Sequence, residues 1–124
     1  MKFRCTKNSI RLRLRRSEID QLAKERRVEE LVTFGPGSVL AIILKTDPNV
    51  EHINAHCNGN IVAINLPDFI ANEWIHSDEI SLKTNQLSGE SEPLNILIEK
   101  DFTCKDRKNE NKADFFQELG DKEC

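Results

Sequence analysis

The segment from residue 58 to residue 83 places the strongest constraint on the fold. It begins with Asn58-Gly59, and both residue types tolerate a positive φ, which makes this pair typical of a hairpin turn. Pro67 and Asp68 suit the start of a helix, because proline lacks an N–H and an acidic side chain favours the positive helix end. Apolar residues at every second position between turn and helix predict a strand with one buried face (Val62, Ile64 and Leu66). The segment therefore predicts a turn, a strand, a short helix and a second strand.

The same pattern recurs in the first half of the chain after a shift of 52 residues. Asn60 then falls on Asn8, and the apolar strand positions fall on Ile10, Leu12 and Leu14. This correspondence predicts two β-α-β repeats, at about 2–46 and 50–100, in a single domain spanning 1–100. The alternative is that two unrelated units share the same period.

The remaining segments complete this prediction. Ser17 is expected to cap a helix that runs to about residue 26, with Asp20 as the acid of a capping box. From residue 101 to residue 124 the chain is charged and aperiodic, which favours a largely disordered tail. The expected strands are 2–5, 10–14, 28–34, 39–46, 51–57, 61–66, 79–83 and 94–99, with a loop at 85–93.

Composition excludes several classes of protein. The chain has 124 residues, and no apolar run approaches the roughly 18 residues that cross a bilayer. Its N-terminus has no continuous apolar stretch of the kind found in secretory signals, so a cytoplasmic location is expected. The four cysteines lack the paired short spacing of a zinc ribbon, and reduced thiols are expected in a cytoplasm.

Basic residues are concentrated at the N-terminus. The first 16 residues hold seven Lys or Arg and no acid, although the whole chain has a net charge of −3. Such a basic pole could contact DNA phosphates, or an acidic protein partner. It could equally be solvated or paired with carboxylates such as Glu29 and Glu30. The candidate DNA-binding residues are Arg4, Lys7, Arg11, Arg13, Arg15 and Arg16.

An enzymatic site has weaker support in the sequence. His52 and His56 would share one face of the strand expected at 51–57, but two ligands are too few for catalytic zinc. Neither a nucleophile with a nearby histidine nor a phosphate-cradling glycine loop is evident. We therefore expect a non-enzyme without a cofactor or metal, and a small-molecule or metal site near these histidines is the alternative.

The repeated motif resembles AbrB/MazE-type swapped-hairpin domains. It comprises Gly59-Asn60, the strand to Pro67, and Asp78-Glu79-Ile80; the first copy has Arg15 in place of the proline. The resemblance implies interleaved hairpins that form one barrel and grip DNA with basic residues on the N-terminal strands. The positions that match these residues are Arg4 and Arg13 in the first copy and His56 and Asn65 in the second. Two copies of the motif in one chain would give a monomer the same barrel that two chains form as a dimer in that family.

The whole chain also resembles an uncharacterised bacterial family of about this length, through the segment Glu99 to Cys104, and this likeness implies no activity. The sequence thus predicts a β-rich α+β protein, a pseudo-two-fold swapped-hairpin-like barrel with two short helices and a polar C-terminal tail. Its expected role is a non-enzymatic binding module of a bacterial cytoplasm, monomeric or weakly dimeric, in the manner of an AbrB-like DNA-binding regulator. A protein-interaction module with an acidic partner is the alternative.

Overall fold

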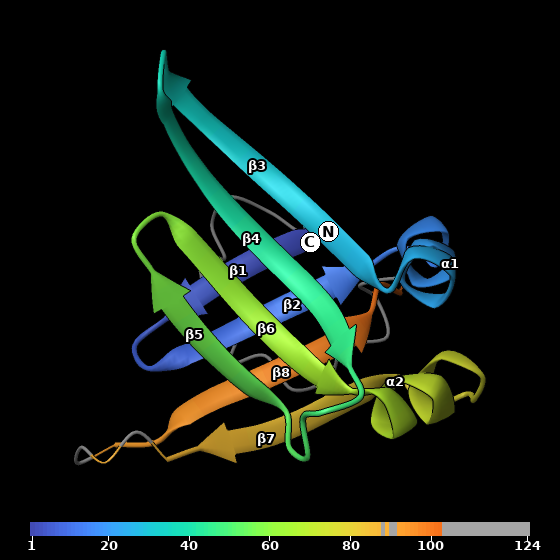
Figure 1. Ribbon diagram of the computed structural model, residues 1–124. Helices are drawn as coiled ribbons and strands as arrows, with labels where there is room; N and C mark the ends of the chain where they lie inside the picture. The colour runs from blue at the N-terminus through green and yellow to red at the C-terminus, as the bar shows by residue number, and fades with distance from the viewer. Residues whose placement is uncertain (88, 90–91, 103–124) are drawn as a thin grey trace, which may run out of the picture.

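Figure 1 shows the computed structural model of the protein, which describes residues 1–87, 89 and 92–102. These residues confirm a β-rich α+β fold with two short helices. The disordered tail predicted for 101–124 lies outside the described residues from position 103 onward. In chain order the elements are β1 (Lys2–Thr6), β2 (Ser9–Leu14), α1 (Arg16–Glu25), β3 (Arg27–Gly35), β4 (Ser38–Asp47), β5 (Asn54–Asn58), β6 (Ile61–Pro67), α2 (Asp68–Ile75), β7 (Ser81–Gln86) and β8 (Leu94–Lys100).

The strands form two separate four-stranded sheets. The first sheet has the order β1-β2-β8-β7 and the second has the order β3-β4-β6-β5. They face each other across the core, with both helices at the same end (Figure 1). The expected swapped-hairpin-like barrel is not closed, because no backbone ladder joins the two sheets within the part of the chain that the structure describes. Where β7 of the first sheet comes close to β5 of the second, a side chain links them. The amide of Gln86 accepts a hydrogen bond from the backbone N–H of Ala55 at 2.7 Å and donates one to its carbonyl at 2.8 Å.

The core lies between the sheets and under the helices. Of the strand positions predicted to face inward, Leu12, Leu14, Ile64 and Leu66 are fully buried. Ile10 and Val62 are partly buried and pack against the core. Trp74 is the largest fully buried side chain, and its Nε1–H donates to the carbonyl of Ile80 at 3.2 Å. This bond satisfies the indole N–H, as burial of a tryptophan requires.

The two halves of the chain are interleaved. The hairpin β1–β2 lies in the first sheet beside β7–β8, whereas β5–β6 lies in the second sheet beside β3–β4. The central strands of each sheet, β2 with β8 and β4 with β6, run parallel, and every other neighbouring pair is antiparallel. Each half therefore contributes one hairpin to each sheet.

The strand registers recur between the two sheets. Lys2 pairs with Arg13 in the first hairpin, and the residues 52 positions later, Asn54 and Asn65, pair in β5–β6. Arg27 pairs with Lys45, and a shift of 54 residues gives the pairing of Ser81 with Glu99. The parallel pairs follow the same two shifts (Ser9 with Asn95, Ile61 with Ala41). We call residues related by these shifts counterparts.

Helix α1 begins earlier than the sequence predicts. Its N-cap is Arg15 rather than Ser17, and the backbone N–H of Arg15 donates to the Glu18 carboxylate at 2.9 Å. Glu18 rather than Asp20 is therefore the acid that closes the first turn. The reason is that Leu14 still pairs with β8, so the chain turns into the helix directly after the last strand residue. In α2 the N-cap is Pro67, and Asp68 opens the helix and pairs with Arg26.

The strand boundaries also differ from the prediction, most of all in β5 and β7. Strand β5 begins at Asn54 rather than at residue 51, because Asn54 pairs with Asn65 close to the end of β6, where Pro67 has no N–H to donate. Strand β7 continues to Gln86, inside the region expected to be a loop, because it pairs with β8 as far as Leu94.

Candidate functional site

The outer face of the first sheet carries several charged side chains. Side chains alternate between the two faces of a strand. Leu12 of β2 and Ile98 of β8 are buried in the core, so the residues next to them in each strand point away from the core. Across the four strands these outward residues are Lys2, Arg4, Thr6, Ser9, Arg11, Arg13, Ser81, Lys83, Asn85, Asn95, Leu97 and Glu99.

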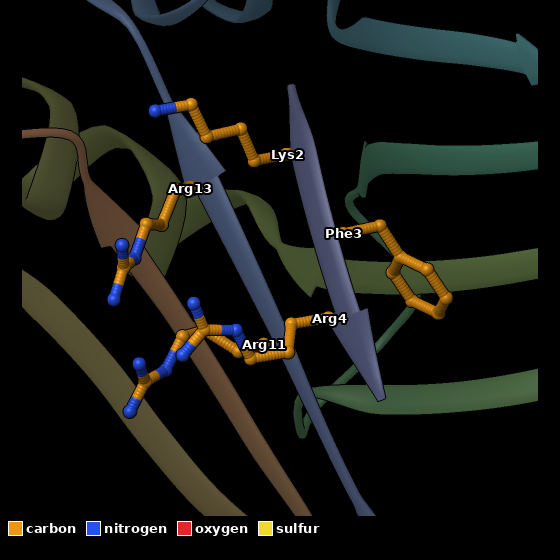
Figure 2. A pocket seen from close by; sticks show the side chains of 5 residues that line it. All are labelled: Lys2, Phe3, Arg4, Arg11 and Arg13. Atoms are coloured by element: carbon orange, nitrogen blue, oxygen red, sulfur yellow. The ribbon is translucent and has the colours of Figure 1, made fainter. Parts of the chain in front are cut away.

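Four cations form two adjacent cross-strand pairs on this face. Lys2 stands opposite Arg13, and Arg4 stands opposite Arg11. Like charges directly opposite each other in a sheet are destabilising. Figure 2 shows these four side chains on one side of β1 and β2 and Phe3 on the other. We call Lys2, Arg4, Arg11 and Arg13 the basic face.

Two carboxylates partly balance the basic face. An oxygen of Glu99 lies 2.6 Å from Nε of Arg13 and 3.9 Å from Nε of Arg11. Lys2 pairs with Asp101 at 3.0 Å. Among the described residues, no carboxylate lies within 4.0 Å of Arg4.

The carboxylates named from the sequence have other partners. Glu29 pairs with Arg27, and Glu30 pairs with the N-terminal ammonium of Met1. The alternative that the N-terminal arginines pair with carboxylates on neighbouring elements is confirmed for Arg11 and Arg13, but Glu29 and Glu30 are not their partners. Their partner, Glu99, lies 86 positions from Arg13, and it becomes a neighbour only because β2 runs beside β8.

Arg13 is buried although it is on the outer face of the sheet. Only 7% of its surface is exposed, and its Nη2 has no hydrogen-bond partner. Leaving a buried donor unsatisfied costs about 1–3 kcal/mol, and more for a charged group. A cavity of about 160 Å³ adjoins it, lined by Lys2, Phe3, Arg4, Arg11 and Arg13.

Three of the six candidate residues lie elsewhere. Lys7 is exposed in the turn between β1 and β2, and Arg15 pairs with Glu18 at 3.5 Å. Arg16 is on α1 and lines a separate cavity of about 450 Å³ near the C-terminal end of α2. The structure thus brings together Arg4, Arg11 and Arg13 and separates the other three.

Sequence reasoning missed Lys2 and Glu99 as members of the site. The signal for Lys2 was available, because it shares the period-2 phase of Arg4 on the same strand. No comparable signal pointed to Glu99, whose position depends on a pairing between the two ends of the chain.

The outer face of the second sheet has a different character. The counterparts of Lys2, Arg4, Arg11 and Arg13 are Asn54, His56, Ala63 and Asn65, which carry no lysine or arginine. Here the amide of Asn65 donates to the side-chain oxygen of Asn54 at 2.9 Å.

The histidines do not form the arrangement expected from the sequence. His52 lies before β5 and His56 lies within it, so the prediction that both share one strand face is wrong. Both side chains are exposed. In residues 1–87, 89 and 92–102, no three His, Cys, Asp or Glu side chains gather closely enough to hold a metal ion.

Glu18 anchors the N-terminus beside the start of α1. Its carboxylate accepts hydrogen bonds from the Met1 ammonium and from the backbone N–H of Arg15. Burial alone would raise the pKa of Glu18, but these donors and the ammonium charge hold the pKa below its ordinary value. Glu18 is therefore ionised in the folded protein at neutral pH.

None of the helices in the described residues is long and apolar enough to cross a membrane. No curated protein and no solved structure matches the chain, so the resemblance to AbrB/MazE-type domains has no support from known proteins. The likeness to an uncharacterised family of about 120 residues is confirmed, because that family's sequence model matches residues 1–119. The chain therefore belongs to a family of unknown function, DUF7009.

Proposed function

We propose that this protein is a non-enzymatic nucleic-acid-binding module whose basic face contacts backbone phosphates, in the manner of an AbrB-like DNA-binding regulator. The observation that carries the proposal is the pair of like-charged cross-strand contacts, Lys2 with Arg13 and Arg4 with Arg11. Such contacts oppose sheet formation unless an anion neutralises them. A nucleic-acid backbone supplies anions at regular spacing.

The position of the cations on the fold also supports this proposal. Arg4 and Arg13 are the two positions that match the DNA-contacting residues of the AbrB/MazE-type motif, and both belong to the basic face. A flat sheet surface that carries basic side chains on adjacent strands can lie against a phosphate backbone. Phosphate contacts position a protein without reading bases, so we expect little sequence preference.

We further propose that the chain arose by internal duplication, with the halves related by a pseudo-two-fold axis as in swapped-hairpin domains. Support comes from the recurring registers and from equivalent side-chain contacts. Asn8 donates to the carbonyl of Pro93, and its counterpart Asn60 donates to the carbonyl of Val39, the counterpart of Pro93. Because the counterparts of the basic face in the second sheet carry no lysine or arginine, this duplicated protein would contact DNA through the first sheet.

A salt titration tests the proposal. Contacts to 3 or 4 phosphates give a slope of log K against log salt near about −3. Fluorescence anisotropy with pooled duplex DNA, between about 50 and 200 mM salt, should show an affinity decrease of about 60-fold. No detectable binding at the lower salt concentration would overturn the proposal and leave an acidic protein partner as the surviving role.

Two matched double variants locate the contact. Arg4→Gln with Arg11→Gln should flatten the slope by roughly 2 units, because each lost phosphate contact removes about one. Lys24→Gln with Lys45→Gln removes the same charge from α1 and from the second sheet, and it should leave the slope nearly unchanged. Equal effects of the two variants would show that net charge, rather than the basic face, determines binding.

A further inference from the structure

We infer that the cavity beside Arg13 is a specific site for one phosphate monoester dianion, distinct from diffuse contact with a nucleic-acid backbone. The inference rests on the proposed function, since it concerns the same face of the first sheet. Its starting observation is the free Nη2 of Arg13, a charged donor in a side chain that is more than nine-tenths buried. Arg13 also lines the cavity, together with the three other cations of the basic face (Figure 2). Its Nη2 itself has almost no exposed surface.

The charge around the cavity fits a dianion. Four cations surround it, and two carboxylates, Glu99 and Asp101, pair with members of this group. Two positive charges remain uncompensated. A phosphate monoester carries about −1.5 to −2 charge at neutral pH, whereas a backbone phosphodiester carries a single charge. The monoester is therefore the better electrostatic match.

The size of the cavity fits a small tetrahedral anion. Its volume of about 160 Å³ is well above the roughly 10–15 Å³ that one water molecule needs. A phosphate group fits a space of this size, and the rest of a larger molecule would lie at the surface. The ligand is thus either free phosphate or the terminal phosphate of a larger molecule.

The orientation of Arg13 is fixed before any ligand binds. Its Nε donates to Glu99 at 2.6 Å, which holds the planar guanidinium against β8. A guanidinium held in this way binds a phosphate oxygen with little loss of side-chain freedom. Arg4 supplies a second donor group at the same cavity. It stands opposite Arg11, and no carboxylate lies within 4.0 Å of it in the part of the chain described.

The second sheet provides an internal comparison. At the counterparts of Arg13 and Lys2, the amide of Asn65 is satisfied by Asn54. No lysine or arginine stands at the counterpart positions, although the strand register is the same. The free donor is therefore a property of these particular residues and does not follow from the fold.

Isothermal titration of the full chain with inorganic phosphate at low salt tests the inference, with chloride at equal ionic strength as the reference. We expect saturable one-to-one binding that Arg4→Gln weakens at least fivefold. Arg13→Gln combined with Glu99→Gln should abolish binding without leaving an unpaired buried charge, and circular dichroism checks that this variant is folded. Lys83→Gln removes a cation from the same face but outside the cavity lining, and it should leave the affinity unchanged.

A second titration identifies the source of the phosphate. A short single-stranded oligonucleotide with a 5′-phosphate should bind at least tenfold tighter than its unphosphorylated form if the ligand is a strand end. Equal affinities, together with binding of inorganic phosphate, assign the site to free phosphate.

Two results would overturn the inference: no saturable binding of phosphate, or equal binding by the wild type and the Arg13→Gln/Glu99→Gln variant. The proposed function fails separately, through the absence of salt-dependent binding to unphosphorylated duplex DNA. A protein that binds the duplex but not inorganic phosphate would therefore retain the proposed function and lose this site.

Discussion

Arg4 on β1 stands directly opposite Arg11 on β2, so two guanidinium groups share one cross-strand position of an antiparallel hairpin. Arg11 has Glu99 at 3.9 Å, whereas Arg4 has no carboxylate within 4.0 Å among residues 1–87, 89 and 92–102. This pairing makes the first hairpin electrostatically unfavourable in the absence of a bound anion.

Replacing Arg4 with threonine should stabilise the free protein. The substitution removes the repulsion and places a residue of high β-propensity on an edge strand, so we expect a gain of about 0.2–1 kcal/mol at low salt. Urea denaturation measures this gain in stability. The gain should be smaller near 1 M salt, where the Debye length is only about 3 Å and the repulsion between the arginines is screened. The control is Lys83→Thr, which changes the same face away from the arginine pair; a loss of stability in Arg4→Thr alone would contradict the prediction.

Replacing Glu99 with glutamine should destabilise the fold strongly. Arg13 is buried and would lose its only carboxylate within 4.0 Å in the described chain, and breaking a buried pair costs about 3–5 kcal/mol. Asp101→Asn removes the carboxylate that pairs with the exposed Lys2, and it should cost only about 0–1 kcal/mol. Thermal or urea unfolding distinguishes the two. Similar losses in both variants would show that Arg13 does not depend on Glu99.

Glu18→Gln should reduce stability at neutral pH and make it less dependent on pH in the acid range. The pKa of Glu18 is lowered in the folded state, so its stabilising contribution is present above its unfolded pKa, near about 4.3. This contribution is lost as the pH falls through the lower folded value. Hydrogen bonds to charged groups contribute about 1.5–3 kcal/mol, so we expect a difference of that order at pH 7.

Urea denaturation of the wild type and Glu18→Gln, from pH 7 to pH 3, measures this difference. The two curves should converge as the pH decreases. Glu25→Gln, an exposed change on the same helix, is the control and should show no such convergence. Parallel curves for the wild type and Glu18→Gln would contradict the assignment.

Lysine substitutions on β3 should reduce self-association at high protein concentration. This edge strand exposes 58% of Leu31 and 69% of Phe34, and the β3–β4 hairpin projects beyond the rest of the protein (Figure 1). Exposed apolar edge strands pair readily with other chains, and a lysine opposes such pairing. Light scattering over a concentration series should show less association for Leu31→Lys, with unfolding free energy changed by less than about 0.5 kcal/mol.

Thr33→Lys supplies the comparison for this experiment. It adds the same charge to the same strand at an exposed polar position, so it separates the effect of charge from the loss of apolar surface. A decrease confined to Leu31→Lys indicates that the apolar side chain drives association. If neither substitution changes the scattering, β3 is not the associating edge.

Local signals in the sequence were sufficient for the strands, their inward faces and both helices. The alternation that ends at Leu66 appears as predicted, since it depends only on neighbouring residues. The turn also appears, but it is shifted by one residue: Asn58 pairs with Ile61, and the loop consists of Gly59, which has a positive φ, and Asn60. The start of α1 was misplaced because Ser17 and Asp20 imitate a capping box. The acid that acts is Glu18, because Leu14 still pairs with the distant strand β8 and the helix begins directly after it.

The assembly of the strands was harder to predict from local patterns. Nothing near Arg13 indicates that β2 runs beside β8, so neither Glu99 nor the separation into two sheets could be read from periodicity. The candidate site was therefore predicted only in part. The alternation of inward and outward side chains along β2 identified Arg11 and Arg13. This alternation ends with the strand at Leu14, because Arg15 and Arg16 belong to the start of α1.

The interleaving of the two halves determines how the chain must fold. A backbone cut in the connection at residues 48–53 would give two fragments, each of which holds one hairpin of both sheets. Neither fragment could cover its apolar strand faces alone, because the missing partners would lie on the other fragment. Mixed together, the fragments should reconstitute one folded unit by complementation, with a midpoint that depends on their concentration. In the intact chain, strand β2 of the first hairpin pairs with β8, which is the last strand of the described chain. The pairing of β2 with β8 can therefore form only after nearly the whole domain has been synthesised.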